Sequence, residues 1–370
     1  MTRAGEIFEY LAQLAPLALA ESYDNPGLLA GSPAQPVSRV LVALDITSAV
    51  CAEAAEKGAQ MVVSHHPVIF HPARRILSEG PGRPVWELAR RGLTAVCMHT
   101  NLDMANGGLN DVLADVLGLQ NARILLPAGA FPYKKIVVFV PRAQADAVRQ
   151  AMARAGAGRL GNYDGCSFES PGVGRFRPLA GAHPFIGREG EAAEADEMRI
   201  EAICRGKDLA AVVAAMRAAH PYEEPAFDVF DDEAVREPYG MGRLAEPERE
   251  LPLEDFAREC ARRLSARGAV VYGTDMTRPV RHAALCSGAW DGEMTLPAAK
   301  AGADVILTGE IKHSDVLAAR ECGLDVVAAG HYATEAVVCP WLCRRLGGQF
   351  PQVAFETAES LTDPAHYVNV

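Results

Sequence analysis

The chain has little of what marks secreted, membrane-spanning or nucleic-acid-binding proteins. Residues 1–19 lack the basic start and continuous apolar stretch of a signal peptide, and no apolar run approaches the length that spans a bilayer. Lys and Arg number 36 against 47 Asp and Glu, giving a formal net charge of -11. Because no Lys/Arg stripe stands out to attract phosphates, this balance argues against nucleic acid as the main partner.

Cysteine is also too sparse and too scattered for a disulfide scaffold. There are nine cysteines, an odd number without a tight framework. A pair four residues apart, Cys339 and Cys343, has no second Cys or His pair near enough for a zinc knuckle. We therefore expect a reducing, cytoplasmic protein. Four thiols fall in or beside apolar runs and are expected to act as small core residues: Cys51, Cys97, Cys286 and Cys322.

The sequence does contain a regular alternation of apolar strands and helices. The composition is that of a globular protein, 49% hydrophobic and 22% charged, and 370 residues suffice for two or three domains. Apolar strands at 40–44, 61–63 and 94–98 alternate with helices at 48–57 and 84–91. This order is typical of an α/β fold with a parallel or mostly parallel sheet.

The C-terminal part repeats this pattern. In each part, the third apolar strand is followed by a His-x-x-x-acid pair, His99 with Asp103 and His331 with Glu335. We interpret the match as an internal duplication of an α/β unit. The alternative is that any two strand–helix–strand units look alike.

A segment of a different kind separates the halves. Its predicted elements follow the order strand, helix, strand, strand, helix, strand, which is the ferredoxin-like βαββαβ unit. We predict an inserted α+β domain at 128–237, with boundaries near Pro127 and Pro238. The duplicated α/β core then comprises 1–127 and 238–370.

Three loops that follow predicted strands carry groups able to bind metal. In open α/β sheets, ligands bind beyond the carboxyl ends of the strands. Neutral imidazoles and carboxylates suit Zn, Fe, Mn or Co, and four or five such ligands exceed the needs of one catalytic zinc. A two-metal site that activates water for hydrolysis is therefore plausible. Taken singly, each motif could instead be a core histidine or a turn. The groups are His65 with His66, His99 with Asp103, and His331 with Glu335.

The remaining histidines have weaker cases. His313, shortly after Glu310, is either near the site or simply starts a helix. Three lack comparable partners and are interpreted as structural: His71, His282 and His366. One group in the insertion could line a pocket, although we favour a loop with satisfied hydrogen bonds: His183, His220, Tyr222, Glu223 and Glu224.

Together the motifs resemble the dinuclear-metal-centre hexameric family, whose members are known as GTP cyclohydrolase type-2-like or NGG-interacting-factor-like proteins. The stretch E-S-Y-D-N-P-G-L-L at 21–29 is similar to that family's Asp-Asn-x-Gly-Leu signature, with Tyr23 where Trp is usual. The resemblance covers the whole chain, and the insertion looks like that of longer bacterial members, whose extra domain is similar to the PII and CutA proteins. The motifs that carry it are S-H-H-P at 64–67, H-T-N-L-D at 99–103, T-G-E at 308–310 and A-A-G-H-Y-A-T-E at 328–335.

The resemblance implies a toroidal homo-hexamer with two divalent metal ions per subunit facing an inner cavity. Asp103 and Glu335 would be bridging carboxylates, and His99 a nearby non-ligating or labile group. Some family members are reported as GTP cyclohydrolases, which open the imidazole ring of guanine. The metal ligands that the resemblance implies are His65, His66, Asp103, His331 and Glu335.

Two functions of different classes follow. The first is a metal-dependent hydrolase, in which His99 or Glu310 shuttles protons as a catalytic residue. The second is a non-enzymatic metal-binding or regulatory assembly, whose PII-like insertion senses a small molecule or meets a partner. A third, nucleic-acid handling across the hole of a ring, is weakened by the acidic balance.

Overall fold

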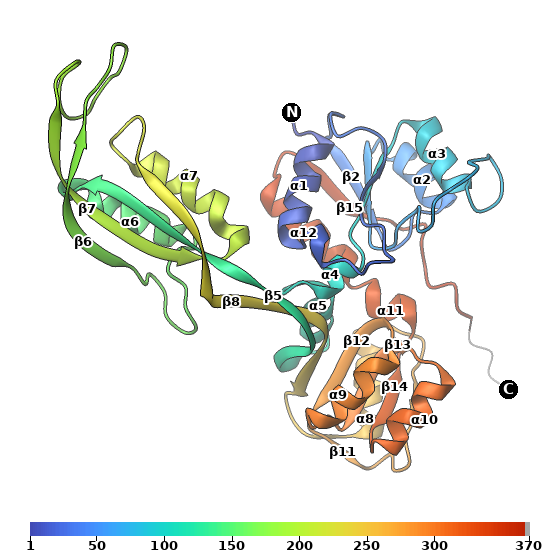
Figure 1. Ribbon diagram of the computed structural model, residues 1–370. Coiled ribbons are helices and arrows are strands. Elements are labelled where there is room, and N and C mark those ends of the chain that lie inside the picture. Colours follow the sequence, from blue (N-terminus) through green and yellow to red (C-terminus); the bar gives the residue numbers. More distant parts are fainter. Residues whose placement is uncertain (367–370) are drawn as a thin grey trace. The chain divides into compact units, whose positions relative to one another are not determined.

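The computed structural model describes residues 1–366 and divides into two compact units. The core unit comprises Met1–Ala128 and the chain from Tyr239 onward, and the insertion unit is Gly129–Pro238. Two long strands, β5 (Leu119–Pro141) and β8 (Phe227–Pro247), contribute residues to both units (Figure 1). The predicted mixed α/β class is confirmed.

The first half of the core unit is a five-stranded sheet in the order β1-β4-β3-β2-β15. Strands β2, β3 and β4 run parallel, with Val63 paired to Val42 on one side and to Val96 on the other. Every residue of β3 and β4 is buried, which explains why their sequences are continuous apolar runs. The elements are α1 (Ala4–Leu14), η1 (Leu17–Leu19), β1 (Gly27–Ala30), β2 (Arg39–Ala43), α2 (Ser48–Glu56), β3 (Met61–Ser64), α3 (Arg83–Arg91), β4 (Thr94–Cys97), α4 (Thr100–Met104) and α5 (Leu109–Val116).

The second half repeats this plan in the order β10-β14-β13-β12-β8. Strands β12, β13 and β14 are parallel, and β10 pairs antiparallel with β14 as β1 does with β4. The short helices α4 and α11 both follow the third parallel strand of their half. The elements are β9 (Leu251–Pro252), α8 (Leu253–Arg263), β10 (Val270–Tyr272), β11 (Pro279–Val280), β12 (Ala283–Ala289), η4 (Gly292–Met294), α9 (Thr295–Lys300), β13 (Val305–Glu310), α10 (His313–Glu321), β14 (Asp325–Ala328), α11 (His331–Glu335), α12 (Val338–Gln349) and β15 (Ala354–Thr357).

The structure corrects some sequence expectations in this half. The chain returns to the first half at β15, which pairs parallel with β2 and was not anticipated from its four residues. Cys322 was expected in the core, but it is exposed because it is the cap residue that ends α10 just before Gly323. Cys51, Cys97 and Cys286 are buried as predicted.

The insertion unit has its own sheet and core. Its strands lie in the order β8-β5-β7-β6, and its elements follow the chain order strand, helix, strand, strand, helix, strand. Val138 of β5 and Ile200 of β7 pack with Val148 of α6 and Val212 of α7, so both helices cover one face of the sheet. The remaining elements are η2 (Arg142–Gln144), α6 (Ala145–Arg154), β6 (Phe168–Phe176), β7 (Ala193–Cys204), η3 (Gly206–Asp208) and α7 (Leu209–Ala219).

Within residues 1–366, the helices are too short or too polar to cross a lipid bilayer.

A buried arginine joins the two halves of the core unit. Arg243 of β8 is 1% exposed, and its Nε and Nη2 donate to the two carboxylate oxygens of Asp111 in α5 at 2.7 and 2.8 Å. The same guanidinium donates to the backbone carbonyls of Gly240, Gly242 and Ala105. The planar guanidinium therefore fixes the segment after α4 against the second half. Helix α4 itself carries part of the candidate site described below.

We expect Arg243→Met to lower the free energy of unfolding by about 3–5 kcal/mol, because it leaves Asp111 and three carbonyls without their donor. Urea denaturation followed by circular dichroism would measure the loss. The matched control is Arg258→Met, since Arg258 is exposed and pairs only with Glu254 on the surface of α8, where about 0–1 kcal/mol is expected. Equal losses of unfolding free energy in the two variants would show that Arg243 holds the two halves together no better than a surface ion pair does.

Candidate metal centre

The site lies where strand ladders of both halves end. Main-chain hydrogen bonds continue past the strands, from His66 N to Leu44 O at 2.9 Å and from Met98 N to Ser64 O at 2.9 Å. In the second half, Gly330 N donates to Gly309 O at 3.0 Å, directly before α11. The ladders thus fix the backbone up to the predicted ligands, and Figure 1 shows α4 and α11 where the two halves meet.

Each imidazole of the site has its Nδ1 atom held by an acceptor of the protein. His65 Nδ1 donates to the carbonyl of Met98 at 2.8 Å, which is 33 residues away in sequence. His66 Nδ1 donates to Asp45 Oδ1 at 2.8 Å. A carbonyl or carboxylate can only accept, so these bonds place the proton on Nδ1 and leave the Nε2 lone pair for another partner.

The other two imidazoles follow the same arrangement. His99 Nδ1 donates to Asp24 Oδ1 at 2.8 Å, and His331 Nδ1 lies 3.2 Å from Glu310 Oε1. Metal-binding histidines characteristically have their second ring nitrogen oriented in this way.

The Nε2 atoms converge with two buried carboxylates. Glu335 Oε2 lies 2.9 Å from His66 Nε2 and 3.1 Å from His331 Nε2. His65 Nε2 lies 3.7 Å from Asp103 Oδ1 and 3.9 Å from Glu335 Oε1. Two groups of three are compact enough to hold a metal ion: His65, His66 and His99, and His66, His331 and Glu335.

The environment gives the imidazoles different proton affinities. Burial lowers the pKa of His65 to about 4, so this ring is neutral. Burial also disfavours charge on His66, but the carboxylates of Asp45 and Glu335 outweigh it and raise the pKa of His66 to about 10. The carboxylate of Glu335 raises the pKa of His331 to about 9 against the effect of burial.

The two carboxylates are displaced in opposite directions. Burial and the negative charge of Glu335 raise the pKa of Asp103 well above its usual range. Burial would raise the pKa of Glu335 as well, but the imidazoles of His331 and His66 outweigh it and hold that pKa well below the usual range. The positive charge of the nearby imidazoles thus stabilises the ionised form of Glu335 more than that of Asp103.

The donor set fits a metal ion. His65 Nε2 and Asp103 Oδ1 are buried and make no hydrogen bond to any residue in the described part of the chain, and Glu335 Oε2 is buried between the Nε2 atoms of His66 and His331. A buried polar atom left unpaired costs about 1–3 kcal/mol, so the first two atoms need a compensating partner. Nitrogen and oxygen ligands of this kind suit Zn, Fe, Mn or Co, and all three atoms belong to predicted ligands.

A glycine shapes the space for Glu335. Gly288, near the end of β12, has φ +60°, and a Cβ atom there would overlap Glu335 Oε1 and lie 3.3 Å from His331 Nε2. Gly288 N donates to Thr334 Oγ1 at 3.1 Å, which ties this turn to α11. Gly288 therefore admits the carboxylate to the site. The sequence analysis did not identify it, because one glycine in an apolar strand carries no distinctive signal.

The structure brings all predicted ligands and His99 together. Glu310, predicted to transfer protons, is exposed, and its Oε1 lies 3.2 Å from His331 Nδ1, where it can orient that ring. His313 is the exposed first residue of α10. Sequence reasoning missed Asp24 and Asp45. The only signals were the resemblance at 21–29 for Asp24 and a position at the end of a predicted strand for Asp45.

Fold and site define a class: an α/β protein of two similar halves, with a cluster of histidines and carboxylates able to hold metal where the halves meet. The chain belongs to the Duf34/NIF3 (NGG1p interacting factor 3) family, whose model matches residues 2–364.

Curated relatives and a solved structure agree with this assignment. A Halalkalibacterium halodurans protein named "GTP cyclohydrolase 1 type 2 homolog" is 39% identical over 327 residues, covering 88% of this chain and 87% of the relative. A Bacillus subtilis protein of the same name is 37% identical over 92% of this chain and 91% of its own length. The crystal structure of a Bacillus cereus protein related to NIF3 has a TM-score of 0.83 and 35% identity, covering 99% of both chains.

Metal affinity should depend strongly on pH. A ligating imidazole is neutral, so loading must displace the protons that pKa values of about 10 and 9 keep on His66 and His331. Affinity should therefore rise with pH up to about 9, by about tenfold per pH unit for each displaced proton. Chelator competition from about pH 6 to 9, with calorimetry in two buffers of different ionisation enthalpy, would measure this. An affinity independent of pH would contradict it.

Gly288→Ala should reduce metal binding, because the new methyl group displaces the Glu335 carboxylate and the positive φ is unfavourable for alanine. We expect at least about a tenfold loss of affinity, measured by metal analysis after dialysis. Gly347→Ala in α12 is the control, since a Cβ there meets nothing within 4 Å. Full metal content in Gly288→Ala would show that the glycine does not shape the site.

Proposed function

We propose that the protein is a metal-dependent hydrolase that attacks an electrophilic ring carbon, with the imidazole ring of a guanine nucleotide as the first candidate substrate. The observation that carries this proposal is the convergence of four Nδ1-anchored imidazoles and two buried carboxylates from both halves of the core. We further propose two divalent metal ions per subunit, held by His65, His66, Asp103, His331 and Glu335, and a homo-hexamer. When bound, such ions lower the pKa of water and stabilise negative charge that develops on the substrate.

His99 is suited to carry the proton in this reaction. Its Nδ1 atom donates to Asp24, so its free Nε2 can accept a proton from a water molecule in the site. Burial disfavours charge on Asp24, but hydrogen bonds from His99 and Thr100 lower its pKa to about 2. The ionised Asp24 then stabilises the imidazolium that forms when His99 takes up the proton.

A cavity beside the site offers room for the substrate. Its volume is about 640 Å³, and its lining includes His66, Asp45, Tyr332 and Arg83. This size is in the usual range for small-molecule sites. His66 lines this cavity and also lies 2.9 Å from Glu335 Oε2, so a molecule in the cavity would lie against one of the proposed metal ligands.

The test compares turnover of wild-type and Asp24→Asn protein, both loaded with metal. Asparagine can still accept the hydrogen bond from His99 Nδ1, but it has no negative charge to stabilise the imidazolium. The turnover rate should therefore fall by about 10²–10⁴ while metal content stays unchanged. Loss of guanine ultraviolet absorbance with GTP reports the reaction, and Asp146→Asn on the surface of α6 is the matched control. Metal-loaded wild-type protein that leaves GTP and a panel of cyclic amidines unchanged would refute the proposal.

The second candidate is a non-enzymatic assembly that uses the insertion unit to bind a ligand. A cavity in that unit, separate from the metal centre, supports it. A protein carrying both His65→Ala and Asp103→Ala distinguishes the two functions. It should lose metal in either case, and only a non-enzymatic role that does not need the metal would survive in the cell.

A further inference from the structure

We propose that the insertion unit contains a binding site for a planar nitrogen heterocycle that presents N–H donors to the carboxylate of Glu197. This inference is independent of the metal chemistry. Tyr222, Glu223 and Glu224 line a cavity in this unit, which is the alternative that the sequence left open beside a loop with satisfied hydrogen bonds. His220 is satisfied as expected, with Nε2 bonded to Phe139 O and Nδ1 accepting from Tyr222 N.

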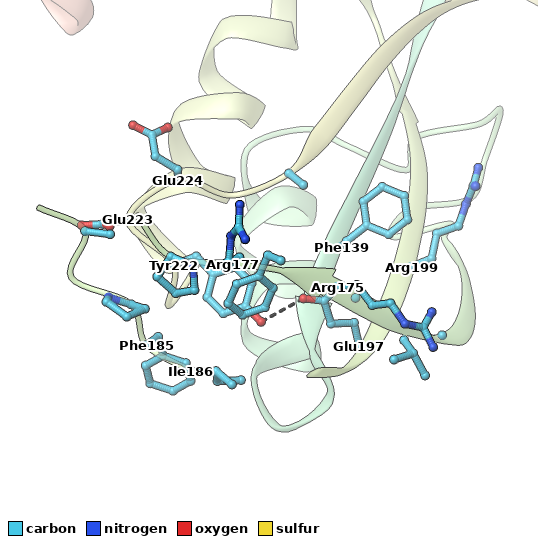
Figure 2. Close-up of a pocket in the computed structure, with 18 of the residues that line it drawn as sticks. Phe139, Arg175, Arg177, Phe185, Ile186, Glu197, Arg199, Tyr222, Glu223 and Glu224 are labelled. Carbon is cyan, nitrogen blue, oxygen red and sulfur yellow. Dashed lines mark hydrogen bonds between the residues drawn. The ribbon is translucent and has the colours of Figure 1, made fainter. Parts of the chain in front are cut away.

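The cavity lies on the sheet face that the helices leave uncovered. Along β7, Ile200 points into the core under α6 and α7, so Glu197 and Arg199 point to the opposite face. There the β6–β7 hairpin and the segment at 182–186 enclose about 570 Å³ (Figure 2). This volume suits a small organic molecule.

Glu197 is the polar centre of the cavity. It is 7% exposed, and its Oε1 accepts a hydrogen bond from the Tyr222 hydroxyl at 2.8 Å, drawn in Figure 2. Oε2 receives no hydrogen bond from residues 1–366 and is not fully buried, so it is open to the cavity. A ligand that donates N–H groups to this carboxylate would bind favourably, because hydrogen bonds to a charged group are stronger than those between neutral groups.

The sequence makes room for this carboxylate. Gly172 pairs with Glu197 across the β6–β7 hairpin, and a Cβ atom at Gly174 would overlap the Glu197 carboxylate. Burial and the charge of Glu197 raise the pKa of Tyr222, so its hydroxyl remains a donor. The carboxylate is therefore held in a fixed place beside the cavity.

Aromatic rings provide the apolar part of the site. Phe176 and Phe185 flank Tyr222, with ring centroids 5.9 and 6.3 Å from it. Phe185 is 54% exposed although it is a large apolar ring, and Phe139 adds a further ring to the lining. A flat ring can stack on such side chains while its edge reaches Glu197.

The charges of the lining are balanced. The charged residues of the lining are Arg175, Arg177, Arg199, Glu197, Glu223 and Glu224. Two of its arginines also form ion pairs with glutamates of β7, Arg175 with Glu194 and Arg199 with Glu201. A neutral ring with adjacent N–H donors therefore fits beside Glu197 without adding net charge. Guanine has this edge, because its ring N–H and its amino group point the same way and a carboxylate accepts from both.

The test measures nucleoside binding to the full-length protein by equilibrium dialysis. Guanosine should bind below about 1 mM, and 1-methylguanosine, which lacks the ring N–H, should bind at least about tenfold more weakly. Glu197→Gln should weaken guanosine binding by at least about tenfold. Glu233→Gln, an exposed carboxylate in β8 paired with Arg236, should leave binding unchanged.

Two results would overturn the inference. One is no guanosine binding by the wild-type protein at about 1 mM, and the other is equal affinity of guanosine and 1-methylguanosine. The nucleoside comparison needs no variant, so it holds even if Glu197→Gln fails to fold. Equilibrium dialysis measures nucleoside binding and not turnover at the metal centre. The hydrolase proposal and this proposal can therefore fail independently of each other.

Discussion

The core unit depends on the burial of two carboxylates among four imidazoles. Asp103 and Glu335 lie inside the protein, where an ionised carboxylate is stable only with positive charge or donors around it. His66 and His331 supply this charge to Glu335, whereas burial and the charge of Glu335 raise the pKa of Asp103. His65 Nε2 and Asp103 Oδ1, buried without a partner, are costly for a fold by itself, and a bound cation would satisfy both atoms.

The fold meets this constraint by fixing the ligands through contacts on the side away from the site. His65 and His66 lie directly beyond a strand whose ladder partners fix their backbone, and a carbonyl or carboxylate holds each Nδ1 atom. The second half enters the same site through α11, and Arg243 joins the two halves next to it. Because the ligands come from both halves, the packing of the two similar halves builds the site: each half alone would supply one carboxylate and an incomplete set of imidazoles.

The sequence was sufficient to predict those features of the fold and the site that depend on a local pattern of residues. Apolar runs located the parallel strands, and since strand ends meet at one edge of a sheet, the residues just beyond them were the candidate metal ligands: His65, His66, His99, Asp103, His331 and Glu335. Contacts between distant segments could not be predicted in this way. Asp24 lies 75 residues from His99, and β15 joins a strand more than 300 residues earlier. No periodicity encodes such pairings, because either partner would look ordinary in its own segment.

The loop around Tyr222 in the insertion unit shows the same limit. The backbone N–H of Tyr222 bonds His220, two residues away, but its hydroxyl bonds Glu197 on a strand 25 residues earlier. In both units a buried carboxylate lies beside a space that the protein does not fill. At Glu335 the surrounding groups are imidazoles, which favour a metal ion. At Glu197 they are aromatic rings and charged side chains of both signs, which favour a neutral ring with N–H donors. The neighbours of the carboxylate, more than the carboxylate itself, therefore determine the class of ligand.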